Sequence, residues 1–417
     1  MFSANLPLPT AIVGATAPKR LRFGEMDFSR LGIGWRFPQE GRLYRGKARF
    51  ARFVGRFMEW AKRGQKLEVE SVRGSGEEIW NASSADVNFP EHLIIMVNGI
   101  VGSAEDWRYA AEQFVKKLPD KVIVHRSECN SLRLTFDGVD LMGERLAEEV
   151  QSVVMRRPGV QKISFVAHSL GGLVARYAIG RLYEPISCGE SSLETGNCLS
   201  EEKQVKGKIA GLEPVSFITF ATPHLGSRGN KQLPFLCGLP FLEQRASQTA
   251  HLIVGRTGKH LFLTDNDDGK PPLLLQMVDD HNDLKFMSAL RSFKRRVVYA
   301  NANYDHMVGW RTSSIRRQHE LPKHHLLVRD EKYPHIVYIE RENPDNIVGV
   351  SRARDQTVDL EEKMITGLRK VPWERVDVSF QKSTQRYIAH STIQVKSYWL
   401  NSDGADVVLH MIDNFLV

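Results

Sequence analysis

The stretch ISFVAHSLGGLVARYA, residues 163–178, decides the fold class because it changes from strand to helix within a few residues. An apolar run ends at His168, Ser169 follows, and two glycines lead into a sequence with helical character. A serine at such a corner has one of two uses. Its hydroxyl caps the helix, or it projects from the corner as a nucleophile.

The pattern around this corner repeats along the chain from residue 92. Short apolar runs alternate with stretches whose apolar residues recur at helical spacing, as in Val139, Met142, Leu146 and Val150. Strands that alternate with crossover helices form a parallel sheet that is covered on both faces. We therefore expect an α/β fold with strands near 92–99, 121–127, 162–168, 215–221, 295–301 and 375–380, and a terminal helix from about residue 403.

Two long segments interrupt this alternation. Residues 182–212 are polar and contain glycine and serine, which is typical of a surface excursion. Residues 224–290 are too long for a loop in a compact domain and contain apolar runs without clear periodicity. Two interpretations stay open for the second insertion: a cap over a site, with Leu236 and Leu274 lining an acyl pocket, or helices that only pack.

A nucleophilic serine needs small neighbours and an oxyanion hole. Ala167 and Gly171 stand two positions either side of Ser169, where larger side chains would collide with the neighbouring strand and helix. One oxyanion donor is the backbone N–H of Leu170, the residue after the serine. The loop after the first strand supplies the second through Ile100, since the preceding glycine lets the chain turn close to the nucleophile.

A base and an acid must follow on loops after later strands, in the order serine, acid, histidine. Asp305 follows the strand expected at 295–301, and His390 follows the strand expected at 375–380. His410 is the competing histidine, but it falls within the apolar stripe of the terminal helix. Each of these residues alone is an ordinary turn or surface residue, and their joint order favours Ser169, Asp305 and His390.

At this point the sequence resembles the α/β-hydrolases, and more closely a family of serine esterases with lipase-like members in plants and fungi. The resemblance covers about residue 92 to the C-terminus. It implies an α/β-hydrolase fold with a mostly parallel sheet and a cap-like insertion, the nucleophile at Ser169, the acid at Asp305, the base at His390, and a lipid or ester substrate. The segments that carry it are VNGIVGSAEDW, TFDGVDLMGERLAEEV, SFVAHSLGGLVARYAIG, FATPHLGS, HLFLTD, YDHMVGWRTSSIRR and HSTIQVK.

The sequence departs from this pattern at two positions. Asn98 stands where many relatives have histidine, which changes the hydrogen bonding behind the oxyanion loop. Ala167 replaces the first glycine of the elbow. Neither change removes a catalytic atom. His224, in the segment FATPHLGS, is expected to brace the site, with a plain turn as the alternative.

The expected function is that of a serine carboxylester hydrolase acting on a lipid-like acyl ester, with no metal or cofactor. An acyltransferase with the same three residues, or a ligand-binding protein of this fold without catalysis, are the alternatives. The four cysteines show no metal-ligand spacing, and free thiols are expected, although Cys188 and Cys198 are close enough in sequence for a disulfide.

The first 91 residues form a basic extension before the hydrolase domain, which we place at 92–417. The chain carries a net charge of +8 with 42% hydrophobic residues, and no apolar run is long enough to span a membrane. Residues 42–64 mix arginine and lysine with aromatic residues, so a solvated helix and contact with an anionic membrane surface both stay open. No nucleic-acid-binding signature is present. The start of the chain faintly resembles an organelle transit peptide. The expected location is intracellular, either cytoplasmic or in an organelle such as a plastid.

Overall fold

A seven-stranded sheet forms the centre of the computed structural model, which describes residues 90–186, 207–227, 255–266, 269–281, 283–341 and 360–417. Six strands correspond to those expected from the sequence, and nearly all their side chains are buried because helices cover both faces. These strands are His92–Val97 (β1), Val122–Arg126 (β2), Lys162–His168 (β3), Glu213–Phe220 (β6), Arg295–Asn301 (β7) and Glu374–Val378 (β9).

The strand order is β2-β1-β3-β6-β7-β9-β8, and all neighbouring pairs up to β9 are parallel. The seventh strand, Ile336–Arg341 (β8), pairs antiparallel with β9 at the edge of the sheet. This strand was not expected from the sequence. Because the six parallel strands point the same way, their C-terminal ends lie along one edge of the sheet, where the residues after β1, β3, β7 and β9 meet.

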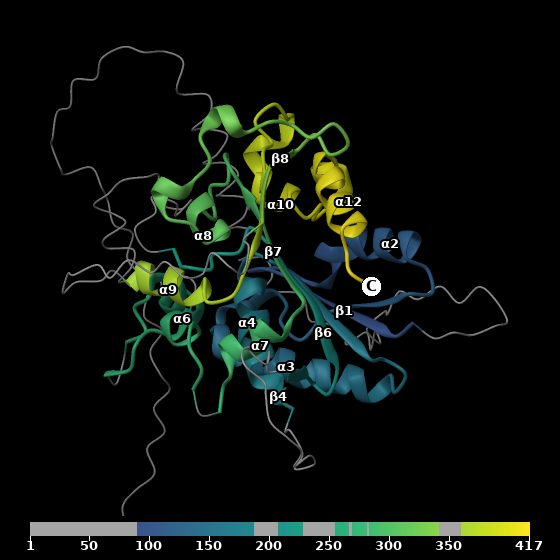
Figure 1. Cartoon of the computed structure of the whole chain (residues 1–417), viewed down its shortest axis with the longest axis vertical. Coiled ribbons are helices and arrows are strands. Elements are labelled where there is room, and N and C mark those ends of the chain that lie inside the picture. Colours follow the sequence, from purple (N-terminus) through teal and green to yellow (C-terminus); the bar gives the residue numbers. More distant parts are fainter. Residues whose placement is uncertain (1–89, 187–206, 228–254, 267–268, 282, 342–359) are drawn as a thin grey trace, which may run out of the picture. The chain divides into compact units, whose positions relative to one another are not determined.

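Helices cover both faces of the sheet, and the two sides have separate apolar cores. Figure 1 shows α2 and α12 on one side and α3, α4 and α7 on the other. This arrangement confirms the α/β-hydrolase fold with a mostly parallel sheet. The bounds of these helices are Arg108–Lys117 (α2), Val139–Arg156 (α3), Leu170–Leu182 (α4), Phe286–Ser292 (α7) and Ala405–Asp413 (α12).

Shorter helical segments lie mainly in the connections. Several of them follow the C-terminal ends of the strands and therefore surround the edge where the candidate residues meet. They are Ala104–Trp107 (η1), Leu132–Phe136 (η2), Leu273–Gln276 (α6), Trp310–Ser314 (α8), Gln318–Glu320 (η4), His324–Leu326 (η5), Leu360–Leu368 (α9), Thr384–Ile388 (η7), Ala389–Thr392 (α10), Tyr398–Asn401 (α11) and Ser402–Gly404 (η8).

The two insertions contribute structure at their described ends. Tyr183–Pro185 (β4) and Gly207–Ile209 (β5) form a small antiparallel pair at the base of the first one. In the second, α6 and α7 pack into the same core as α3 and α4. Leu274 is fully buried in that core, so the expectation that it lines an acyl pocket is wrong.

Some expectations fall on residues that the structure does not describe. The extension before residue 90, the middle of the second insertion with Leu236, and the cysteines at 188, 198 and 237 lie outside the described residues. Within the described part of the chain, no helix has the length and apolar character needed to cross a membrane.

Candidate active site

The corner at Ser169 is a sharp turn between β3 and α4. Ser169 has φ 54° and ψ −129°, a backbone conformation that residues other than glycine rarely adopt. Its N–H donates to the carbonyl oxygen of Phe220 at 2.8 Å, which fixes the strained corner to the end of β6. The Ser169 side chain makes no capping hydrogen bond to α4. The Ser169 hydroxyl therefore does not cap α4, the first of the two uses that the sequence left open.

Glycines allow three chain segments to meet at this corner. A β-carbon at Gly171 would lie 2.4 Å from the carbonyl oxygen of Asn98 and 2.6 Å from that of Val97. A β-carbon at Gly99 would lie 2.9 Å from the Cβ atom of Ser169. The loop after β1 thus passes directly against the serine, as expected from Gly99.

The structure brings together the three residues expected to act as nucleophile, base and acid. The Nε2 atom of His390 lies 3.0 Å from the Ser169 Oγ atom, and its Nδ1 atom lies 3.0 Å from Asp305 Oδ2. These residues are separated by 85 and 221 positions in the sequence. They meet because each follows a strand of the parallel sheet: β3, β7 and β9.

The carboxylate of Asp305 is buried, and every oxygen has a donor. Oδ2 accepts from Asn301 Nδ2 at 2.9 Å as well as facing His390, and Oδ1 accepts from the N–H groups of Met307 and Val308 at 2.9 and 2.8 Å. Burial alone would raise the pKa of Asp305, but the nearby His390 and these hydrogen bonds outweigh it and hold the pKa below its ordinary value. A carboxylate held charged in this way suits the role of orienting an imidazole.

Two backbone amides near Ser169 are available to a ligand. The N–H groups of Ile100 and Leu170 have no hydrogen-bond partner among the residues that the structure describes. The next amide, that of Val101, is already used, since it donates to the Thr135 side chain at 2.9 Å. The two amides expected to form an oxyanion hole are therefore free of competing hydrogen bonds within the described residues.

Asn98, the residue that replaces histidine, stabilises the loop that carries Ile100. Its Nδ2 atom donates to the carbonyl oxygen of Asn130 at 2.9 Å and to that of Gly99 at 3.1 Å. The Asn98 side chain is buried, so these bonds tie the loop after β1 to the loop after β2. Although Asn98 departs from the family pattern, its side chain thus supports the loop that carries Ile100.

Glu149 on α3 holds the loop after β2 in place. Its carboxylate accepts from the Ser127 hydroxyl at 2.6 Å and the Glu128 N–H at 2.9 Å, and it contacts His125 Nε2 at 3.1 Å. Burial would raise the pKa of Glu149, but the hydrogen bonds, led by that of His125, lower it to about 2. This contact could not be predicted from the sequence, because the groups lie on different elements.

His168 makes a contact with His390 that was not expected from the sequence. Its Nε2 atom lies 2.7 Å from the carbonyl oxygen of His390, and the two rings lie 4.6 Å apart between centroids. An N–H at Nε2 would donate to that carbonyl. Burial, followed by the proximity of His390, lowers the pKa of His168 well below its ordinary value. A neutral ring that packs on His390 helps to fix the position of that residue.

The remaining histidines singled out in the sequence lie elsewhere. His224 is buried, contacts Thr219 Oγ1 at 3.0 Å, and its carbonyl accepts from Arg176. It therefore braces the end of β6 and makes no described contact with Ser169. His410 lies within α12 as expected, where its Nδ1 atom is 2.9 Å from the hydroxyl of the buried Tyr299.

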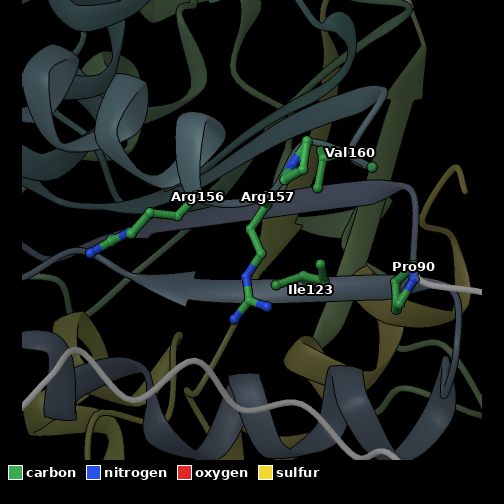
Figure 2. Close-up of a pocket in the computed structure, with 7 residues that line it drawn as sticks. Pro90, Ile123, Arg156, Arg157 and Val160 are labelled. Carbon is green, nitrogen blue, oxygen red and sulfur yellow. The ribbon is translucent and has the colours of Figure 1, made fainter.

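A cavity lies at the opposite end of the strands, lined by Ile123 near the start of β2 and by Val160 shortly before β3. Its volume is about 260 Å³. Figure 2 shows Arg157 reaching toward Ile123 while Arg156 points away. The length of β3 separates this cavity from Ser169 by roughly 20 Å, so the cavity is distinct from the candidate site. Among the described residues, no cluster of three or more His, Cys, Asp or Glu side chains is arranged to hold a metal ion.

Comparison with known proteins agrees with this geometry. Residues 88–315 match the family described as "Putative serine esterase (DUF676)". The chain is similar to the putative lipase ROG1 of Saccharomyces cerevisiae, with 30% identity over 246 residues, which cover 57% of this chain and 31% of that protein. It is also similar to the putative lipase C4A8.10 of Schizosaccharomyces pombe, with 28% identity covering 54% of this chain and 26% of that protein. The chain thus spans about a third or less of the length of these curated relatives.

Among solved structures, the mature lipase BlEst2 of Bacillus licheniformis is similar with 16% identity and a TM-score of 0.31, over 55% of this chain and 74% of that one. An esterase of Pyrococcus furiosus is similar with 15% identity and a TM-score of 0.29, over 54% and 65% of the two chains.

Proposed function

Since the chain belongs to the family described as putative serine esterases, we propose that it is a serine hydrolase that cleaves the carboxylic ester bond of a lipid-like acyl substrate. The observation that carries the proposal is the hydrogen-bonded series from Ser169 Oγ through His390 to Asp305, at a corner where two backbone amides remain open. A lipid-like substrate is supported by the relatives, which are named as lipases.

The first half of the proposed reaction forms an acyl-enzyme. Ser169 Oγ attacks the carbonyl carbon of the ester while His390 Nε2 takes its proton. Asp305 accepts a hydrogen bond from His390 Nδ1, which leaves Nε2 as the basic nitrogen and stabilises the imidazolium. The N–H groups of Ile100 and Leu170 stabilise the negative oxygen of the tetrahedral intermediate. The C–O bond to the alcohol then breaks, and His390 gives its proton to the leaving alcohol.

Water completes the cycle. His390 removes a proton from the water, and the resulting hydroxide attacks the acyl carbon. The bond to Ser169 Oγ then breaks, His390 returns the proton to that oxygen, and the acid leaves. An acyltransferase would use the same residues with an alcohol in place of water. The products of a reaction with a labelled ester and an added alcohol decide between hydrolysis and acyl transfer.

The test is labelling of the purified full chain with a fluorophosphonate, followed by peptide mapping. Ser169→Ala should abolish labelling and lower ester hydrolysis by roughly three to six powers of ten with the fold intact. The matched control is Ser383→Ala, because Ser383 is a true helix cap whose hydroxyl accepts from the Gln385 N–H at 2.8 Å. Labelling that persists in Ser169→Ala, or that disappears equally in Ser383→Ala, would contradict the assignment.

A further inference from the structure

Five large apolar side chains project into solvent beside the candidate active site. They lie on η7 and α11, and we call them the aromatic ridge. Trp399 is the most exposed, at 94%, and Tyr387 and Leu400 are each 65% exposed. Isolated exposed apolar residues are normal, but a contiguous group marks an interaction surface. The members of the ridge are Tyr387, Ile388, Tyr398, Trp399 and Leu400.

The two segments of the ridge are fixed to each other by polar side chains that face inward. Gln385 on η7 donates to the Ser402 hydroxyl at 3.0 Å and accepts from the Asp403 N–H at 3.1 Å. The buried Asn401 donates to Thr392 Oγ1 at 3.0 Å. Polar groups are thus internal and apolar groups external, the reverse of an ordinary solvated helix surface. The ridge presents its apolar side chains on a preorganised support.

The ridge segments carry cations, of which Lys396 is paired with Asp106 at 2.9 Å, while Lys382 and Arg386 have no acidic partner in the described part of the chain. Residues 381–402 contain three cationic side chains, Lys382, Arg386 and Lys396, and no Asp or Glu. Lys382 is exposed, and the Arg386 guanidinium lies over the rings of Tyr304 and Tyr387 at 5.5 and 4.9 Å. Aromatic residues mixed with cations suit the boundary between lipid headgroups and acyl chains, where the charge attracts anionic lipids.

The ridge is continuous with the candidate active site. The ring of Tyr387 meets the ring of Tyr304 edge-on at 6.0 Å, and Tyr304 directly precedes Asp305. Ile388 is two residues before His390 in the chain. Figure 1 places α10, which carries His390, at the same end of the sheet as the start of β8. The ridge therefore begins two residues before the histidine that contacts Ser169.

We propose that the aromatic ridge is the surface by which this protein docks on a bilayer that contains anionic lipids. Trp399, Leu400 and Tyr387 enter the interfacial layer, while Lys382 and Arg386 pair with lipid headgroups. The inference rests on the proposed function only for the identity of the substrate in that bilayer. Docking itself needs no reaction and can be measured in the inactive Ser169→Ala chain.

The test is flotation of the full chain with two kinds of vesicle. One kind contains phosphatidylcholine alone, and the other contains phosphatidylcholine with about 30% phosphatidylserine. The double substitution of Trp399 and Leu400 by Ser should weaken binding to the anionic vesicles by about tenfold or more. Lys382→Glu should weaken it by about fivefold at low salt and little at high salt. The control is Met155→Ser, because Met155 is 76% exposed at the end of α3, near the opposite edge of the sheet.

The outcomes separate this inference from the proposed function. Hydrolysis of water-soluble p-nitrophenyl butyrate should be unchanged in the ridge variants, since these residues are outside the proposed reaction machinery. Normal hydrolysis with vesicle binding that is absent in the wild type, or unaffected by the ridge variants, overturns the docking inference alone. An equal loss of vesicle binding in the control Met155→Ser also overturns the docking inference. Vesicle binding that depends on the ridge, together with a wild-type chain that shows no esterase activity, overturns the proposed function instead. Concentration-dependent dimers that the Trp399 variant abolishes would identify a second copy as the occupant and also overturn the docking inference.

Discussion

Replacing Asp305 by Asn tests the proposed reaction most directly, because the new amide loses hydrogen bonds in either of its two orientations. With the NH₂ group in place of Oδ2, it meets the Nδ2 group of Asn301 and forces His390 to present an unprotonated Nδ1. The proton then lies on Nε2, which cannot act as base. With the NH₂ group in place of Oδ1, it faces the N–H groups of Met307 and Val308, and two hydrogen bonds are lost.

The expected loss of activity follows from the changed tautomer of His390 and from the lost negative charge of Asp305. A wrong tautomer and an unstabilised imidazolium should lower kcat by about 10⁴-fold, or about 5.5 kcal/mol in activation free energy. Substrate binding should change little, because Asp305 is placed behind the imidazole and away from the acyl group. Unpaired donors at a buried position should also lower the free energy of unfolding by about 1–3 kcal/mol.

The assay is the initial rate of p-nitrophenyl butyrate hydrolysis near pH 8, together with the rate of fluorophosphonate labelling and thermal unfolding. Asp330→Asn is the matched control. Asp330 Oδ1 accepts from the N–H groups two and three residues later, Lys332 and Tyr333, each at 2.8 Å, which repeats the turn at Asp305 without a histidine. A folded Asp305→Asn chain within tenfold of wild-type activity, or an equal loss in Asp330→Asn, would refute this reasoning.

Three further predictions concern the surroundings of the site. His390→Ala should be as inactive as Ser169→Ala. His410→Ala should stay active but lower the free energy of unfolding by about 1–3 kcal/mol, because the buried Tyr299 hydroxyl loses its hydrogen-bond partner. A His410→Ala chain that is folded but inactive would reverse the assignment of the base. Glu149→Gln should lower the free energy of unfolding by about 3 kcal/mol at pH 7, because the pKa in the folded state is about 2 against 4.5. A depressed carboxyl pKa stabilises the fold above the unfolded value and loses its effect as pH falls toward 2, so urea titrations should show the difference shrinking below about pH 4.5; a pH-independent difference would argue against it. Gly171→Ala should lower esterase activity at least about tenfold because its methyl group meets two backbone carbonyls, while Gly159→Ala, with open space around it, should change little.

The residues of the site could be placed from sequence because a parallel sheet puts the ends of its strands at one edge. Asp305 and His390 each follow a strand that an unbroken apolar run marks, and the order of the strands then brings them to Ser169. This reasoning needs no knowledge of side-chain contacts. It therefore predicted which three side chains lie together, and that Ile100 and Leu170 flank them, but it did not predict the contacts that hold these residues.

The supporting contacts could not be predicted because they depend on side chains far apart in the sequence. Asn98 bonds to the chain 32 positions away, and His168 to a carbonyl 222 positions away. The strand β8 was missed for a different reason. Ile336–Arg341 lies at the edge of the sheet, where alternate side chains are exposed, so its apolar run is short and ends in charged residues.

The backbone of Ser169 has a consequence for how this protein responds to selection. A serine in this conformation costs on the order of 1–3 kcal/mol, and the bond to Phe220 shows that the sheet holds it there. Glycine adopts such angles freely, so Ser169→Gly should retain the fold and match or exceed the wild type in thermal stability while losing the reaction. A search for heat-resistant variants without a screen for activity would thus be drawn toward inactive chains at this position. Robustness and reactivity oppose each other here at a single residue.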